Sequence, residues 1–283
     1  MLNMIEHGQE RANPPLLIVH GLYGSARNWG VIAKRLSDQH HVIAVDQRNH
    51  GDSPWFDTHS YIDMANDLIT VAQHLGRPLN VVGHSMGGKA AMVMALMRPD
   101  LVNRLLVADI APIAYGHDQS QYIQAMQAVD LTQVHKRSDA VEQLAERVDD
   151  TTLQSFFTQS LDVAGKRWKL NLDVLGRDMQ HILGFPEIQG SFDGPALFLS
   201  GSESPYDHAH HVGDYNRAFA LGVTLNLGFV VVEFFFGLLS DSLALLADAG
   251  HNLSDVAGLL LAWGASYLAK APATANRTYG WRK

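Results

Sequence analysis

The 283-residue sequence contains no cysteine, which excludes disulfide bonds, thiolate zinc sites and cysteine nucleophiles. Basic residues are also scarce, because 21 lysines and arginines stand against 29 aspartates and glutamates, a net charge of −8. This balance leaves no basic footprint, and we expect no nucleic acid as a partner. The first fifteen residues lack an apolar core, so we expect no signal peptide and a cytoplasmic location for the residues that follow.

The charges that are present are distributed unevenly. They occur throughout the chain up to about residue 206, whereas residues 218–240 carry only Glu233 and a second apolar stretch follows at 242–268. About 20 apolar residues suffice to span a bilayer, and basic residues flank the pair. We therefore interpret 218–268 as an apolar helical hairpin that could contact a membrane or form a homodimer, with a buried helix pair as the alternative.

Short apolar runs bounded by turn residues predict buried strands, at 16–19, 42–45, 79–82, 104–109 and 196–200. Helical patterns lie between the first four of these runs, at 29–36, 61–75 and 88–97. This alternation predicts an α/β fold, a mainly parallel sheet with helices on both faces. Active sites of such folds lie at the carboxyl ends of the strands.

The pattern changes between residues 114 and 190, where we expect helices without strands, for example at 121–129 and 140–148. A helical insertion at this place predicts a cap over the carboxyl ends of the strands. Its large side chains Trp168, Phe156 and Phe157 are candidates for the substrate-facing side of the cap. The alternative is that they only form the core of the cap.

Residues 83–87 read Gly-His-Ser-Met-Gly directly after an apolar run. The pattern Gly-x-Ser-x-Gly is typical of a nucleophile elbow, in which a serine lies on a tight turn between a strand and a helix. Gly83 and Gly87 suit this turn because a Cβ at either position would clash where the chain doubles back. Ser85 is therefore the candidate nucleophile.

Four sequence blocks extend this signal, and they are His-Gly-Leu-Tyr-Gly-Ser (20–25), Asp-Gln-Arg-Asn-His-Gly-Asp-Ser (46–53), Gly-His-Ser-Met-Gly-Gly-Lys (83–89) and Asp-Ile-Ala-Pro (109–112). In this order and spacing they resemble small bacterial carboxylesterases of the α/β-hydrolase superfamily, over residues 1–206. The resemblance implies hydrolysis of small to medium acyl esters through an acyl-enzyme. It implies a Ser-His-Asp triad and neither a cofactor nor a metal.

The resemblance also implies the roles of single residues. Ser85 would be the nucleophile, and the backbone N–H groups of Leu22 and Met86 would form the oxyanion hole. Loss of one such donor typically lowers the rate by ~10²–10³. The acid of the triad would be Asp109, with Glu203 in reserve.

The last part of the chain, from residue 216 to 283, has a second resemblance. The blocks at 216–219, 237–255 and 277–280 are similar to the first two membrane helices of the cation diffusion facilitator family. In that family His251 and Asp255 would be metal ligands on one helix face. A tetrahedral site needs about four ligands, and the other two come from a later helix, so we expect no metal site here.

The catalytic histidine of the α/β-hydrolase fold lies after the final strand, where the esterase resemblance has already stopped. The sequence pattern of residues 243–268 resembles the strand, Gly-His loop and closing helix that an α/β-hydrolase needs at this place. We therefore predict His251 as the base. The alternatives are His208, His210, His211 or no base.

The predicted organisation is an α/β-hydrolase core at 1–113, a helical cap at 114–190 and a core strand and loop at 191–206. The hairpin at 207–283 is the candidate to complete the hydrolase. A catalytically impaired fusion that ends in a partial metal-transport hairpin is the alternative function.

Overall fold

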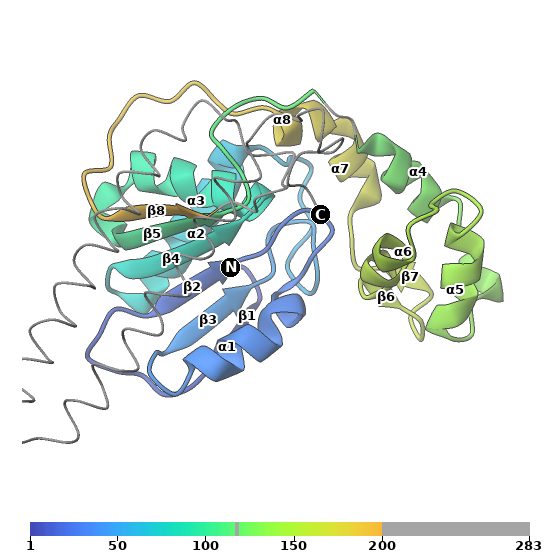
Figure 1. Cartoon of the computed structure of the whole chain (residues 1–283), viewed down its shortest axis with the longest axis horizontal. Helices are drawn as coiled ribbons and strands as arrows, with labels where there is room; N and C mark the ends of the chain where they lie inside the picture. Colours follow the sequence, from blue (N-terminus) through green and yellow to red (C-terminus); the bar gives the residue numbers. More distant parts are fainter. Residues whose placement is uncertain (117–118, 200–283) are drawn as a thin grey trace, which may run out of the picture. The chain divides into compact units, whose positions relative to one another are not determined.

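The computed structural model describes residues 1–116 and 119–199, all of which lie in the compact unit Met1–Asp207 (Figure 1). The centre of this unit is a six-stranded sheet with the strand order β1-β3-β2-β4-β5-β8. Its strands are β1 (Met4–His7), β2 (Leu16–Val19), β3 (Val42–Val45), β4 (Leu79–His84), β5 (Val102–Ala108) and β8 (Ala196–Leu199). Every neighbouring pair is parallel except β1 with β3, so the sheet is mainly parallel, as predicted.

Side chains alternate between the two faces of the sheet, and each face has its own apolar cluster. Leu17 and Ile43, which pair in register, pack with helices α2 (Tyr61–Leu75) and α3 (Met86–Met97). Ile18 and Ala44 point the other way, toward the short helix η1 (Ala26–Trp29) and helix α1 (Gly30–Leu36). The strand period of two therefore produces a three-layer arrangement, with helices on both faces of the sheet.

The cap follows β5 and lies beside the sheet in Figure 1. Its elements are α4 (Ser120–Gln127), η3 (Leu131–Gln133), α5 (Arg137–Leu144), α6 (Thr151–Thr158), β6 (Leu161–Asp162), β7 (Arg167–Trp168), α7 (Leu172–Arg177) and α8 (Met179–Leu183). The expectation of helices without strands is wrong at β6 and β7, which pair as an antiparallel hairpin. Strands of two residues are too short to show a period, and the turn between them is held by Asp162, which accepts a hydrogen bond from the Gly165 N–H.

The core strands also differ from prediction at their ends. Strand β1 was not predicted, because its residues Met-Ile-Glu-His mix apolar and charged side chains at the edge of the sheet. Strand β5 begins at Val102 rather than at residue 104, after the short helix η2 (Pro99–Leu101). The prediction of an apolar hairpin at 207–283 lies outside the described residues. Within the described part of the chain, no helix is long and apolar enough to cross a bilayer.

Candidate active site

Ser85 occupies the turn between strand β4 and helix α3. Its backbone has φ 51° and ψ −123°, a conformation that a non-glycine residue rarely adopts and that is found mainly at functional sites. A Cβ on Gly87 would lie 2.4 Å from the carbonyl oxygens of Val19 and His20, and one on Gly83 would lie 2.4 Å from that of Gly87. Strand, turn and helix are therefore packed backbone against backbone, and the glycines permit the strained turn that presents Ser85.

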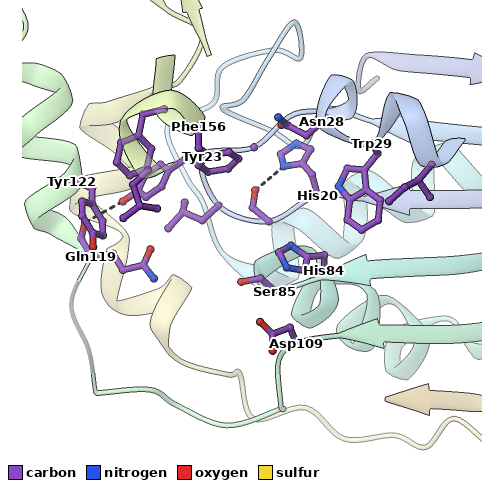
Figure 2. Close-up of a pocket in the computed structure, with 16 residues that line it drawn as sticks. His20, Tyr23, Asn28, Trp29, His84, Ser85, Asp109, Gln119, Tyr122 and Phe156 are labelled. Carbon is purple, nitrogen blue, oxygen red and sulfur yellow. Dashed lines mark hydrogen bonds between the residues drawn. The ribbon is translucent and has the colours of Figure 1, made fainter. Parts of the chain in front are cut away.

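The side chain of Ser85 reaches a cavity of about 570 Å³ between the carboxyl ends of the strands and the cap (Figure 2). Its walls come from the loop after β2, from the ends of β4 and β5, and from the cap helices α4 and α6. The lining residues are His20, Gly21, Leu22, Tyr23, Gly24, Asn28, Trp29, Ile32, His84, Ser85, Asp109, Gln119, Tyr122, Leu153, Phe156 and Phe157. Ile32 is also 47% exposed, so it marks the mouth of the cavity.

The loop after β2 places Leu22 on this cavity and also on a second one of about 40 Å³, which Ser85 and Met86 line as well. Met86 is the first residue of α3, and the N–H groups of the first turn have no partner within a helix. The positive end of the helix dipole also lies there. Leu22 and Met86 therefore lie beside Ser85 on two different elements, the loop after β2 and the first turn of α3.

Two buried histidines fix the loop that carries Leu22. The Gln47 N–H donates to Nε2 of His20 at 2.9 Å, so the proton of this ring lies on Nδ1, 2.8 Å from the Gly21 carbonyl oxygen. His50 accepts from the Tyr23 N–H through Nε2 and contacts the Arg48 carbonyl oxygen through Nδ1. Burial lowers the pKa of both rings. Each ring already uses both of its nitrogens in these contacts, so neither is free to take a proton from Ser85.

Tyr23, in the same loop, connects the core to the cap. Its hydroxyl donates to the Gln119 carbonyl oxygen at 3.1 Å, and its own carbonyl oxygen accepts from Ser160 Oγ at 3.0 Å. Gln119 precedes α4, and Ser160 follows α6. The loop that carries Leu22 is therefore hydrogen-bonded to the cap at two places, just before α4 and just after α6.

Asp109 follows strand β5, which is adjacent to the strand that precedes Ser85. Its backbone has φ 58°, and its N–H donates to the Leu199 carbonyl oxygen at 2.7 Å. The side chain lines the cavity, and its Oδ1 is buried with no hydrogen-bond partner among the described residues. A buried carboxylate oxygen without a donor is unfavourable, so it marks a place where a donor is missing.

His84, next to Ser85 in the chain, also lines the cavity, where its ring lies 6.0 Å from that of Trp29. Burial lowers the pKa of His84, and the nearby Asp109 raises it in part. The predicted base His251, its alternatives His208, His210 and His211, and the reserve acid Glu203 all lie outside the described residues. The structure thus brings together Ser85, Asp109, Leu22 and Met86.

The three predicted substrate-contacting residues fall in two places. Phe156 and Phe157 line the cavity, and Figure 2 shows Phe156 across from Ser85, while Trp168 is not part of the lining. Trp168 is 6% exposed, and its indole N–H donates to the Met126 carbonyl oxygen at 2.9 Å within the cap. Two aromatic lining residues, Trp29 and Tyr122, were not predicted. The position of Trp29 close after the 20–25 block is a signal that could have identified it.

In residues 1–116 and 119–199, histidine, aspartate and glutamate side chains form no group of three or more that could hold a metal ion.

Comparison with known proteins identifies relatives of both parts of the chain. The family described as the alpha/beta hydrolase fold matches residues 14–233, and the cation efflux transmembrane domain matches residues 220–283. The first match confirms the esterase-type scaffold, and the second supports the resemblance of the tail to a cation-efflux protein.

Individual relatives agree with the first match. The sn-1-specific diacylglycerol lipase ABHD11 of Mus musculus is 39% identical over 219 residues, which cover 73% of this chain and 71% of the relative. Esterase YbfF of Escherichia coli (strain K12) is 37% identical over 199 residues, or 69% of this chain and 76% of that protein. A solved structure, a marine microorganism esterase, superposes with a TM-score of 0.69 at 35% identity, covering 75% of this chain and 85% of its own.

Proposed function

The chain belongs to the α/β-hydrolase family and is a carboxylic ester hydrolase, and we propose that Ser85 is its nucleophile on small to medium acyl esters. The observation that carries this proposal is the strained turn at Ser85, which holds the side chain against the cavity of about 570 Å³. A turn of this kind persists only where the surrounding structure enforces it, here through the close backbone packing at Gly83 and Gly87.

The proposed reaction has two halves. Ser85 Oγ attacks the ester carbonyl carbon while its proton passes to an imidazole, and the carbonyl oxygen becomes an oxyanion held by the N–H groups of Leu22 and Met86. The intermediate expels the alcohol, which takes the proton from the imidazole. Water then attacks the acyl-Ser85 ester by the same route, releasing the carboxylic acid and free Ser85.

We propose Asp109 as the residue that orients this imidazole and His251 as the residue that supplies it. The support for Asp109 is its buried Oδ1, which has no donor among the described residues at the carboxyl end of the strand beside Ser85. The support for His251 is the sequence pattern alone, a Gly-His loop before an apolar helix. A neutral imidazole hydrogen-bonded to Asp109 would satisfy this oxygen and present its other nitrogen to Ser85.

The composition of the cavity supports apolar acyl groups as substrates. Leu153, Phe156, Phe157 and Tyr122 add apolar surface to the lining, and Figure 2 shows Phe156 and Tyr122 across from Ser85 and Asp109. The volume of about 570 Å³ lies within the range of ~300–1,000 Å³ that is usual for small-molecule sites. The chemistry needs no cofactor.

A second function remains a candidate because the cation efflux domain matches residues 220–283. In this alternative the chain is a fusion whose tail contacts a membrane or a second copy through 218–268 and supplies no base. The hydrolase unit would then be catalytically impaired. The cytoplasmic location stays a prediction under both functions.

The test is hydrolysis of p-nitrophenyl butyrate by the full chain and by single variants. We expect Ser85→Ala and His251→Ala each to lower kcat by ~10⁴ or more, the scale for loss of a triad member, with the exposed His74→Ala as the unaffected control. A wild-type rate for His251→Ala would show that the base lies elsewhere. An inert wild-type protein would contradict the proposed triad and favour the catalytically impaired fusion.

A further inference from the structure

Lys89 is a buried ammonium group one helical turn after Ser85. It is 1% exposed and is among the largest fully buried side chains in the described part of the molecule. Lysines are almost never buried in this way unless they are paired, yet no described carboxylate forms an ion pair with Lys89. Its position beside the nucleophile turn therefore needs another explanation.

The ammonium group is held by carbonyl oxygens and aromatic rings instead. Nζ donates to the carbonyl oxygens of Leu183, at 2.9 Å, and Gly184, at 2.6 Å, where helix α8 ends. A cation at this end of a helix is favoured by the helix dipole. Nζ also lies 4.7 Å from the ring centroid of Tyr115 and 5.6 Å from that of Tyr61, within cation–π range.

These contacts lead from Lys89 to the turn at Asp109. The Leu183 carbonyl oxygen that accepts from Lys89 also accepts from the Tyr115 N–H at 3.0 Å. The Tyr115 hydroxyl accepts from the Ala111 N–H at 2.8 Å, and Ala111 lies two residues after Asp109, whose φ is 58°. Lys89, Tyr115 and Ala111 thus connect the helix that begins after Ser85 with the strained turn that presents Asp109.

We propose that Lys89 is a positioning residue for Asp109, acting through Tyr115 to hold the turn after β5 at a fixed distance from Ser85. This inference rests on the proposed role of Asp109 as the acid of the triad. Lys89 need not contact substrate in this role. Its ammonium group holds Tyr115 through the ring face and through the Leu183 carbonyl oxygen, to which both residues donate. Tyr115 in turn holds the backbone at Ala111.

The environment of Lys89 predicts a loss of activity at high pH. Burial lowers the pKa of Lys89 to about 8. Among the described residues, the titratable groups that face it are the phenols of Tyr61 and Tyr115. Burial, and secondarily Tyr115, raise the pKa of Tyr61, so that phenol stays neutral in this range. As the pH rises through 8 the ammonium loses its charge, and with it the cation–π attraction and part of the attraction to the carbonyls.

Hydrogen exchange tests the positioning without depending on activity. At pH 7, we expect Lys89→Met and Tyr115→Phe to speed amide exchange in peptides that cover residues 109–116, by about tenfold or more. Peptides of strand β2 should exchange as in the wild type. The matched control is Lys34→Met on the exposed side of α1, which should change neither region. Unchanged exchange at 109–116 in both variants would overturn the proposal.

A double-mutant cycle tests whether Lys89 acts through Asp109. We expect Lys89→Met to lower kcat by ~10–100-fold, with KM changed less than about threefold, and to remove the loss of activity near pH 8. In an Asp109→Asn background the same change should lower kcat by less than about threefold. Additive losses would overturn the positioning role. Wild-type kinetics for Asp109→Asn alone would instead refute the acid assignment and the positioning role with it, even if exchange at 109–116 is fast.

Discussion

The two halves of the sheet differ in how completely they are buried. In the half formed by β3 and β2, Leu17, Val19 and Ile43 are 0% exposed, and helices cover both faces. In the half that ends at β8, Leu197 is 50% and Leu199 48% exposed. Ser85 follows β4 and Asp109 follows β5; these two strands pair with each other, with β2 on the other side of β4 and β8 on the other side of β5. The nucleophile therefore lies one strand nearer the covered half, and the acid one strand nearer the exposed strand β8.

This difference separates the parts of the site that depend on residues 1–199 from those that depend on the rest of the chain. The turn at Ser85 is held within residues 1–199, since Gly87 packs against the end of β2 and the Ser85 N–H donates to the Ala108 carbonyl oxygen of β5. At the end of β5, Oδ1 of Asp109 has no donor among the described residues. The local structure at Ser85 is thus built by residues 1–199, whereas the base was predicted beyond them.

Gly87→Ala should have the largest effect, because it adds a Cβ where helix α3 packs closely against the backbone at the end of β2. The new Cβ would lie 2.4 Å from two carbonyl oxygens of the β2 end, and backbone cannot move aside cheaply. We expect a loss of more than ~4 kcal/mol of unfolding free energy, or no folded protein. The matched control is Gly30→Ala, since nothing lies within 4 Å of a Cβ there. Equal urea unfolding curves for the two variants would contradict the elbow packing.

Ile43→Ala removes a fully buried side chain from the centre of the covered half. We expect it to lower the unfolding free energy by about 2–5 kcal/mol, the range for such a truncation in a packed core. The change lies away from the cavity, so KM for a soluble ester should stay within about twofold. Urea denaturation at pH 7 gives the first value. A loss below ~1 kcal/mol would mean that this half is packed more loosely than the burial of Ile43 indicates.

Low pH should lower the unfolding free energy through the buried histidine His59. Burial lowers the pKa of His59 to about 3, whereas the unfolded chain takes up this proton near 6.5. Below pH 6.5 the unfolded state therefore binds more protons, and stability falls as the pH falls toward 3. Between pH 6.5 and 4 we expect His59 to contribute a loss on the order of 2–3 kcal/mol. Comparing urea unfolding of wild type and His59→Gln over this range isolates the contribution, and parallel curves would refute it.

Leu197→Ser should have the smallest effect, because it changes the exposed half. Leu197 pairs in register with Leu106 but is 50% exposed, so its removal from water on folding is incomplete. We expect a change in unfolding free energy of less than ~0.5 kcal/mol. A loss comparable to that of Ile43→Ala would mean that β8 is covered in solution and that the two halves are equivalent.

Much of the fold could be predicted from local patterns in the sequence. The strands at 16–19 and 42–45 and the helix at 61–75 have the predicted bounds, since continuous apolar runs and the Ser60 cap with Gly76 define their ends. Strand β1 and the β6–β7 hairpin were missed because short or charged strands depend on their pairing partners rather than on a period.

The candidate site was predictable only where a motif encodes backbone geometry. The Gly-x-Ser-x-Gly pattern predicts the turn at Ser85 because the glycines are required by local clashes. Which aromatic side chains face the cavity depends on the packing of the cap, and here Trp168 turned inward while Trp29 and Tyr122 line the wall. The carbonyl contacts of Lys89 link α3 to the end of α8, about 94 residues later in the chain, and no local pattern encodes them.

Two of the hydrogen bonds of Tyr23 tie the loop that carries Leu22 to the cap. Lifting the cap away from the core would break the bonds to Gln119 and Ser160, while His20 and His50 would still hold the loop from the core side. Movement of the cap would therefore reach Leu22, the proposed oxyanion donor, through Tyr23.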